Sequence, residues 1–131
     1  MAPDAERTVL DFIARLNAHD VEAILALCTP DHVFMDSLGR AIVGRETMRQ
    51  PWRQYFELFP DYRIAVHEVA SAGDTVAVFG AASATYAKGR DPQRAFWTIP
   101  AAWRARVVAG LLAEWQVYAD LKLVYEILSA G

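Results

Sequence analysis

The sequence predicts an α+β fold in which three N-terminal helices pack against a cone-shaped, curved sheet of antiparallel or mixed strands. Up to about residue 59 the apolar residues recur at helical spacing, whereas from about residue 62 they alternate with a period of two. Glycine-bearing turns separate the later segments, as in a meander of hairpins. The chain has 131 residues, and we therefore expect one domain over residues 1–131.

Two helices are expected before residue 30. The apolar stripe of the first consists of Val9, Phe12, Ile13 and Leu16. This spacing predicts an amphipathic helix over about residues 4–18. Asp20 is a suitable N-cap for a second helix over about residues 21–28, and Pro30 is expected to end that helix.

A short strand, a turn and a third helix come next. The strand is expected over about residues 32–36, and residues 36–39 read as a turn that begins with Asp36 and ends with Gly39. The third helix is expected from Gly44 to about Phe59. Because Pro51 lies inside it, we expect either a kink or a late helix start.

The second half of the chain predicts the sheet. Its strands are expected over about residues 62–71, 74–87, 93–106 and 111–120. Gly80 and Pro100 fall inside these strands and are expected to curl the sheet, with Pro100 at a bulge or an edge. A short helix over residues 121–128 should follow. A curled sheet closed by helices forms a cone with a hollow of ligand size.

Composition limits the partners of the chain. Apolar residues make up 54% of it, with four Trp, five Tyr and six Phe, and this surplus favours a dry cavity or an oligomer contact. The net charge of −3 gives no sign of a nucleic-acid partner. Arg45, Arg49 and Arg53 are spaced along one helix face, which nearby glutamates predict to be a solvated, ion-paired face.

Cysteine usage and hydropathy predict the compartment. Cys28 is the single cysteine, so no disulfide forms within the chain, and we expect it to be a small buried hydrophobic residue. The segment from Met1 to Arg7 lacks the apolar core of a signal peptide, and no apolar run reaches the length of a membrane span. We therefore expect a cytoplasmic protein that has no membrane partner.

Asp36 and Asp120 are the candidate catalytic residues, because each ends an apolar strand. Alternate side chains of a strand share a face, so Phe34 points with Asp36, and Tyr118 points with Asp120. If these faces meet in one apolar cavity, one carboxyl group could act as an acid and the other as a base. The alternative is that Asp36 is an Asx-turn residue and that Asp120 caps the last helix.

Five further residues are expected to build or serve this cavity. Phe12, Phe34 and Trp115 should wall it or support its walls. His32 shares the face of Asp36 under strict alternation and could tune the base, but a partly exposed histidine at the start of the strand is the preferred interpretation. Tyr118 is the best hydrogen-bond donor toward a substrate, although Tyr55, Tyr62 and Tyr86 could also donate. No spacing resembles a metal site, a phosphate-binding loop or a nucleophile elbow, so neither a metal nor a cofactor is expected.

Five stretches of the chain resemble the nuclear transport factor two-like superfamily, and within it the SnoaL-like and ketosteroid isomerase-like proteins. They are Asn-Ala-His-Asp-Val-Glu-Ala-Ile at residues 17–24, His-Val-Phe-Met-Asp at 32–36, Val-Gly-Arg-Glu at 43–46, Phe-Pro-Asp-Tyr at 59–62 and Trp-Gln-Val-Tyr-Ala-Asp-Leu at 115–121. Their order and spacing extend over nearly the whole chain. The resemblance implies the cystatin-like roll of this superfamily and a homodimer formed through the sheet.

The resemblance also implies roles for single residues. Asp36 falls where ketosteroid isomerases place their general base, but Phe12 and Ala102 fall where those enzymes place the donors that stabilise the oxyanion. Asp120 falls where SnoaL-like polyketide cyclases and limonene epoxide hydrolases carry an acid/base aspartate. The epoxide hydrolases need an Arg and a second Asp on a neighbouring strand, and residues 79–83 contain neither. The cyclase comparison therefore fits best.

These observations lead to one expected function and two alternatives. We expect a cofactor-independent enzyme of the isomerase, cyclase or dehydratase type, which acts on an apolar, carbonyl-bearing small molecule. The first alternative is a non-catalytic protein that binds a ligand in the same cavity. The second is an interaction module whose sheet face docks another chain; Trp97 and Trp103 alternate together and would then cover this face.

Overall fold

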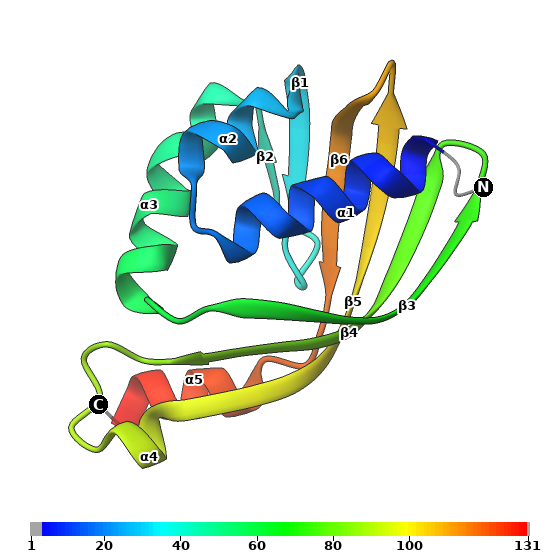
Figure 1. The fold of residues 1–131 in the computed structure, drawn as a ribbon. Coiled ribbons are helices and arrows are strands. Elements are labelled where there is room, and N and C mark those ends of the chain that lie inside the picture. The colour runs from blue at the N-terminus through cyan, green and yellow to red at the C-terminus, as the bar shows by residue number, and fades with distance from the viewer. Residues whose placement is uncertain (1–3, 131) are drawn as a thin grey trace.

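A bent six-stranded sheet, with helices on its concave side, forms residues 4–130, the part of the chain that the computed structural model describes (Figure 1). The elements are α1 (Asp4–Asn17), α2 (Val21–Ala26), β1 (Cys28–Met35), β2 (Ala41–Val43), the 3-10 helix η1 (Glu46–Met48), α3 (Arg49–Leu58), β3 (Arg63–Ala72), β4 (Thr75–Thr85), α4 (Pro92–Ala95), β5 (Phe96–Val108), β6 (Leu111–Tyr118) and α5 (Lys122–Ala130). The strand order is β2-β1-β6-β5-β4-β3, so the sheet does not close. The α+β fold with a curved mixed sheet is confirmed.

The first two helices are confirmed, but the second ends early. The side chain of Asp20 accepts a hydrogen bond from the backbone N–H of Ala23 at 3.1 Å and so caps α2. The prediction that Pro30 ends α2 is wrong, because Pro30 lies within β1. β1 begins already at Cys28, which pairs with Leu112 of β6. Strand pairing therefore outweighs the helical spacing at Cys28, which is buried as expected.

The third helix starts late, as one of the two options for Pro51 required. A single 3-10 turn comes first, and α3 begins at Arg49. Pro51 thus lies in the first turn of α3, where its missing N–H costs no intrahelical hydrogen bond. The arginine face is ion-paired as expected: Arg49 contacts both Glu22 and Glu46.

Two short elements were not predicted. The prediction of a strand from residue 93 is wrong at its start, because α4 (Pro92–Ala95) precedes β5. Asp91 caps this helix by accepting a hydrogen bond from the N–H of Gln93 at 3.0 Å. β2 has three residues, too few for a period of two to appear in the sequence. β3, β4 and β6 lie within two residues of their predicted bounds, whereas β1 begins four residues before its predicted start.

Both residues that were expected to curl the sheet lie at irregular points of it. A Cβ atom on Gly80 would approach the backbone oxygen of Ala65 to 1.9 Å, and the pairing of β3 with β4 shifts register between Val66 and Glu68, beside this contact. Pro100 pairs with Ala81 of β4, whereas the pairing of β5 with β6 reaches only to Ala102. Pro100 therefore lies at a local edge.

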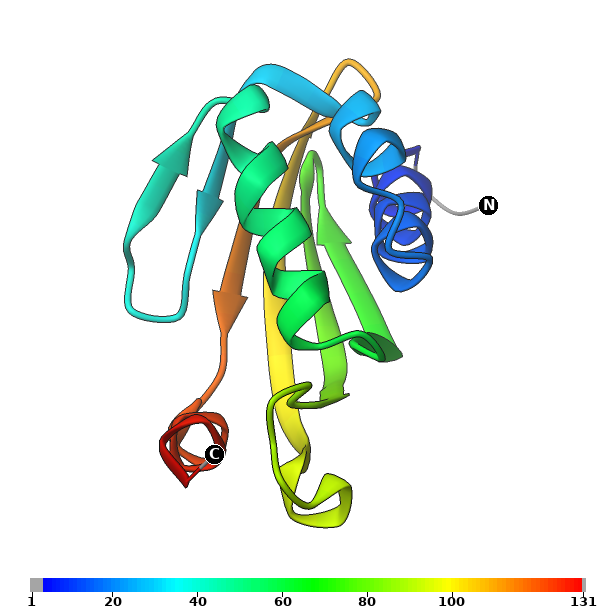
Figure 2. The ribbon, with the colours of Figure 1, turned by 90° about the vertical axis from the view of Figure 1, so that its left-hand side faces the viewer.

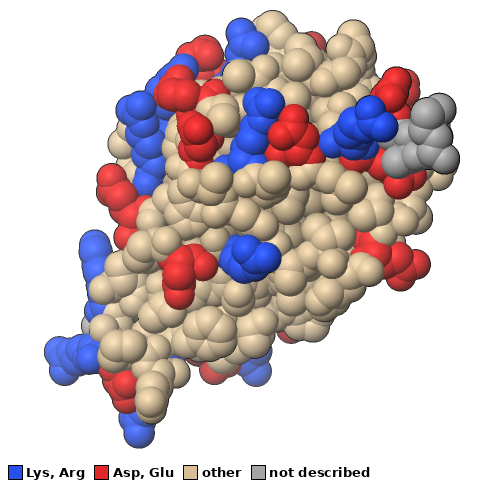
Figure 3. Space-filling model, viewed as in Figure 1, with Lys and Arg blue, Asp and Glu red and all other residues tan. Residues whose placement is uncertain are grey.

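The concave face of the sheet and the helices enclose the core. α1 packs across one end of this face, and α3 crosses in front of the sheet at the other end (Figures 1 and 2). Trp97 and Trp103 are each 2% exposed on the concave face, so they do not cover the outer face of the sheet, and that alternative for them is wrong. On the face that Figure 3 shows, positive and negative side chains are intermixed along α1.

None of the helices within residues 4–130 is both long and apolar enough to cross a membrane. Residues 1–3 belong to the segment in which no signal peptide is expected, and they lie outside the described range.

Candidate functional site: an aromatic cavity

The concave side of the sheet holds a cavity of about 260 Å³ between α3, β1, β5 and β6. Its aromatic lining consists of Phe34, Trp52, Tyr55, Tyr62, Trp97, Trp103 and Trp115. All four tryptophans of the chain are in this set. The volume is slightly below the roughly 300 Å³ at which typical ligand pockets begin. The cavity therefore suits a small molecule of one or two rings.

The lining follows from the periods of the elements that carry it. On β5 the inward residues alternate, so Trp97, Ile99 and Trp103 face the cavity. On α3, Trp52 and Tyr55 lie three residues apart and so share one helix face, with ring centroids 6.4 Å apart. Trp52 packs edge to face with Phe34 and Tyr55, and Trp103 stacks on Trp115, which fixes these walls.

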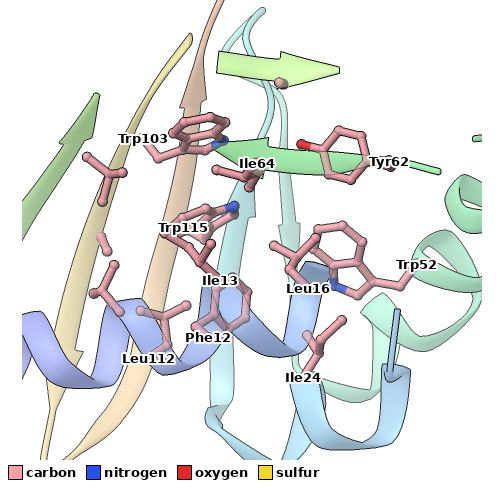
Figure 4. Packing of buried hydrophobic residues seen from close by; sticks show 14 of the residues in the cluster. Phe12, Ile13, Leu16, Ile24, Trp52, Tyr62, Ile64, Trp103, Leu112 and Trp115 are labelled. Carbon is pink, nitrogen blue, oxygen red and sulfur yellow. The ribbon is translucent and has the colours of Figure 1, made fainter. Parts of the chain in front are cut away.

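Three polar atoms point into the interior of this cavity. In Figure 4 the hydroxyl of Tyr62 and the indole nitrogens of Trp103 and Trp115 point toward the same space. The rings of Trp103 and Trp115 are stacked, with centroids 6.1 Å apart and an interplanar angle of 16°. Burial raises the pKa of the Tyr62 hydroxyl well above its ordinary value, so this group stays protonated and can donate a hydrogen bond.

Asp36 lies at the edge of the cavity and is the only carboxylate among its lining residues. Its Oδ1 accepts hydrogen bonds from the backbone N–H groups of Leu38 and Arg40, both at 2.9 Å. Its Oδ2 pairs with Nε of Arg40 at 2.9 Å. Burial pushes the pKa of Asp36 upward, but these bonds to Arg40 and Leu38 outweigh it and hold the pKa below its ordinary value. Asp36 is thus both an Asx-turn residue and a cavity residue.

Asp120 and Tyr118 lie apart from this cavity. Asp120 is exposed and accepts a hydrogen bond from the backbone N–H of Lys122 at 3.0 Å, at the start of α5. Tyr118 is 49% exposed, whereas its neighbours Val117 and Ala119 line the cavity. Neither Tyr118 nor Asp120 is among the residues that line the cavity. The structure therefore does not bring Asp36 and Asp120 together in one enclosed space.

A wide, open groove of about 800 Å³ adjoins the cavity and is where Asp120 lies. Ser37, Ala119 and Leu121 line both the groove and the cavity. Tyr125 of α5 lines the groove as well. The mouth of the cavity therefore opens between the turn after β1 and the start of α5.

The other predicted residues divide between lining and support. Phe34 and Trp115 line the cavity. Phe12 is fully buried and lies behind the wall, with its ring centroid 4.9 Å from that of Trp115. His32 is buried outside the lining, so the expectation of a partly exposed histidine is wrong, and its Nδ1 bonds the backbone oxygen of Leu112 at 2.8 Å. Burial lowers the pKa of His32, which keeps the ring neutral.

Tyr62 was among the tyrosines expected as donors inside the hollow, but Tyr118 was preferred, and Trp103 had no expected role in the cavity. Trp103 was assigned to an outer face, although its alternation with Trp97 and Ile99 was visible. The register places Ala102 opposite Phe79 and Tyr118, both exposed, so Trp103 rather than Ala102 faces the cavity. No local pattern distinguished Tyr62 from the other tyrosines, because it lies just before β3 and its inward direction depends on the whole fold.

Among residues 4–130, no group of three or more His, Cys, Asp or Glu side chains is placed to hold a metal ion.

A search among curated proteins found no match. The SnoaL-like domain family, in contrast, matches residues 9–115.

Solved structures show the same fold over nearly the whole chain. A protein from Jannaschia sp., described as a candidate SnoaL-like polyketide cyclase, is 21% identical with a TM-score of 0.85, over 100% of this chain and 97% of that one. A protein of the same description from Shewanella denitrificans is 16% identical with a TM-score of 0.85, over 99% and 100%. A hypothetical protein with a ketosteroid isomerase-like fold from Catenulispora acidiphila, in complex with trimethylamine, is 17% identical with a TM-score of 0.81, over 95% and 93%. At these identities the likeness shows the fold alone.

Proposed function

We propose that this chain, which belongs to the SnoaL-like domain family, is an enzyme that moves a proton on an apolar, carbonyl-bearing small molecule held in the aromatic cavity. The observation that carries the proposal is the position of Asp36, the one carboxylate among residues that are otherwise almost all apolar or aromatic. A carboxylate beside an apolar cavity can remove a proton from an apolar carbon acid, which water solvates poorly.

Asp36 is the general base in this proposal. Its lowered pKa keeps it ionised at neutral pH, which a base requires. The same hydrogen bonds make it a weak base, so its substrate needs an acidic C–H bond, such as one next to a carbonyl group. Ring closure, isomerisation and dehydration all begin with such a proton transfer.

The proposal uses one aspartate where the sequence suggested two. Asp120 caps α5 at the outer groove, so it could take part only on a substrate that extends out of the cavity mouth. Tyr118 faces outward and is likewise left without a role inside the cavity. The naming of two related folds as candidate polyketide cyclases supports a carbonyl-bearing substrate. The volume favours a substrate smaller than a four-ring polyketide.

Hydrogen exchange on a model ketone tests this proposal. β-Tetralone has two fused rings and acidic protons beside its carbonyl group, and in heavy water these protons exchange when a base removes them. We expect the protein to accelerate this exchange, measured by NMR, and Asp36→Asn to abolish the acceleration while the ketone still binds. Asp91→Asn is the matched control, because Asp91 also accepts a backbone hydrogen bond and pairs with an arginine, but on α4.

Asp120→Asn separates the two versions of the mechanism. Full acceleration in this variant fits a single base at Asp36, whereas a loss equal to that in Asp36→Asn fits a pair of aspartates. Acceleration that survives Asp36→Asn unchanged would contradict the role of Asp36. Binding of the ketone without any acceleration in the wild type would favour the non-catalytic binding protein.

A homodimer through the outer face of the sheet is the second part of the proposal. Phe79 is 44% exposed and Tyr118 is 49% exposed, and Ala102 lies between them in register, so an apolar row crosses the convex face. We expect sedimentation to give a dimer that Phe79→Lys converts to a monomer. Leu10→Lys, at an exposed position of α1, is the control that should leave the dimer intact. A monomeric wild type would contradict this part.

A further inference from the structure

We propose that Tyr62, Trp103 and Trp115 form a set of hydrogen-bond donors that binds an acceptor oxygen of the ligand, so that the cavity selects apolar molecules with an acceptor at their inner end. This inference deepens the proposed function and depends on it. It concerns the orientation and class of the ligand rather than the proton transfer at Asp36.

The three groups come from separate elements and meet in the same space. Tyr62 precedes β3, Trp103 lies on β5 and Trp115 lies on β6. In Figure 4 the indole nitrogens of Trp103 and Trp115 lie on the side of their rings that faces Tyr62, and the hydroxyl of Tyr62 points toward them. Their side chains are nearly enclosed, with exposures of 8%, 2% and 1% in that order. All three line the cavity. None of the three polar atoms forms a hydrogen bond with another residue in the range 4–130.

The chemistry of this set is one-sided. An indole N–H can only donate a hydrogen bond, and the Tyr62 hydroxyl is held in its protonated form by burial. The indole nitrogen of Trp97, which also lines the cavity, is fully enclosed and has no partner within the described chain. A buried donor without a partner is unfavourable, so an acceptor on a ligand would relieve the cost.

The donors and Asp36 make the two ends of the cavity chemically different. The interior offers donors, whereas the carboxylate of Asp36 and the adjacent Ser37 lie among the residues near the mouth. A ligand therefore fits with a carbonyl or ether oxygen inward and with an acidic C–H bond or a donor group toward Asp36. A neutral ligand whose inner end carries only donors would leave the indole N–H groups unpaired and should bind less tightly.

The test compares β-tetralone with tetralin, which has the same two rings and no oxygen. Isothermal titration calorimetry should show that the ketone binds more tightly than the hydrocarbon, although water solvates the ketone better. We expect Tyr62→Phe to reduce this ratio of affinities by about fivefold, the worth of one neutral hydrogen bond. Binding of tetralin should change little, because the variant keeps the ring and loses only the hydroxyl.

A matched tryptophan control removes a lining indole whose nitrogen points elsewhere. In Figure 4 the indole nitrogen of Trp52 points away from the space between Tyr62 and Trp103. Trp52→Phe should therefore weaken both ligands alike and leave their ratio unchanged, whereas Trp103→Phe should lower the ratio. A ratio that responds equally to both tryptophan variants would show a packing effect and overturn the proposal.

The outcomes separate this inference from the proposed function. Equal affinities of the wild type for β-tetralone and tetralin would overturn the donor set, while proton exchange dependent on Asp36 could still hold. A ratio that falls in Tyr62→Phe without any proton exchange would support the donor set in a binding protein. If neither compound binds to the folded wild type, both proposals are overturned.

Discussion

Nε of Arg40 lies 2.9 Å from Oδ2 of Asp36, across the turn that joins β1 to β2. The backbone N–H of Arg40 also donates to Oδ1 of the same carboxylate at 2.9 Å. One residue therefore orients both oxygens of the proposed base and stabilises its charged form. Arg40 itself is exposed, with 72% of its side chain accessible, so its substitution should not disturb the core.

Arg40→Met should raise the pKa of Asp36, because it removes the guanidinium and leaves only the backbone bonds to oppose burial. Exchange that needs the carboxylate is lost as pH falls through this pKa. The loss should therefore begin at a higher pH in the variant than in the wild type. An NMR titration of the carboxyl carbon measures the pKa directly. An unchanged pKa would contradict the role given to Arg40.

Phe12→Ala should lower the free energy of unfolding by about 3–5 kcal/mol, because Phe12 is fully buried and supports Trp115 from behind the cavity wall. Denaturant unfolding measures this loss. Leu10→Ala, on the exposed side of the same helix, should cost less than about 1 kcal/mol. Equal losses in the two variants would mean that Phe12 does not support the wall.

Gly80→Ala should cost about 1–3 kcal/mol, since its Cβ atom would approach the backbone oxygen of Ala65 to 1.9 Å and the strands would have to separate. Ser83→Ala, farther along β4, is the control and should be nearly neutral. The midpoint of thermal unfolding reports both. A Gly80→Ala protein as stable as the control would show that the bend of β3 does not require glycine.

The burial of His32 should make the free energy of unfolding depend on pH. Burial holds its pKa in the folded state below the ordinary value of 6.5, so the unfolded chain binds a proton more readily. This stabilisation is complete above about pH 6.5 and is lost as the pH falls from there toward the folded pKa. Between about pH 7 and pH 5 the wild type should therefore lose more stability than His32→Asn, whose amide can also donate to Leu112.

The carboxylates whose pKa is lowered do not obscure the effect of His32 between about pH 7 and pH 5. Asp36, Glu46, Asp61 and Glu114 lose their stabilisation only as the pH falls below their ordinary pKa values of 3.8 to 4.5. Denaturant unfolding at both pH values provides the comparison for His32. Parallel losses in the wild type and in His32→Asn would refute the assignment of this pH dependence to His32.

Periodicity was enough to predict the main elements. The helical stripe from Val9 to Leu16 and the alternation from Trp97 to Trp103 each follow from one element that buries one face. The end of α2 was predicted wrongly, because Cys28 fits a helical stripe and a paired strand equally well. Only the partner strand, which lies more than 80 residues later at Leu112, decides between them.

The candidate site was predictable only in part, for a similar reason. Phe34 and Asp36 share a face within one strand and its turn, and both do line the cavity. Whether Asp120 joins them depends on where β6 ends and α5 begins, which no local pattern contains. Tyr62 and Trp103 line the same cavity from distant parts of the chain, so their shared position depends on the whole fold.

The most direct test of the central claim, that the aromatic cavity receives a small apolar ligand, is a titration followed by intrinsic tryptophan fluorescence. All four tryptophans line the cavity, so a bound molecule changes every indole environment at once. We predict a saturable change with one- and two-ring ketones and none with a four-ring steroid enone. A folded protein whose fluorescence shows no saturable change with any of them would contradict the claim.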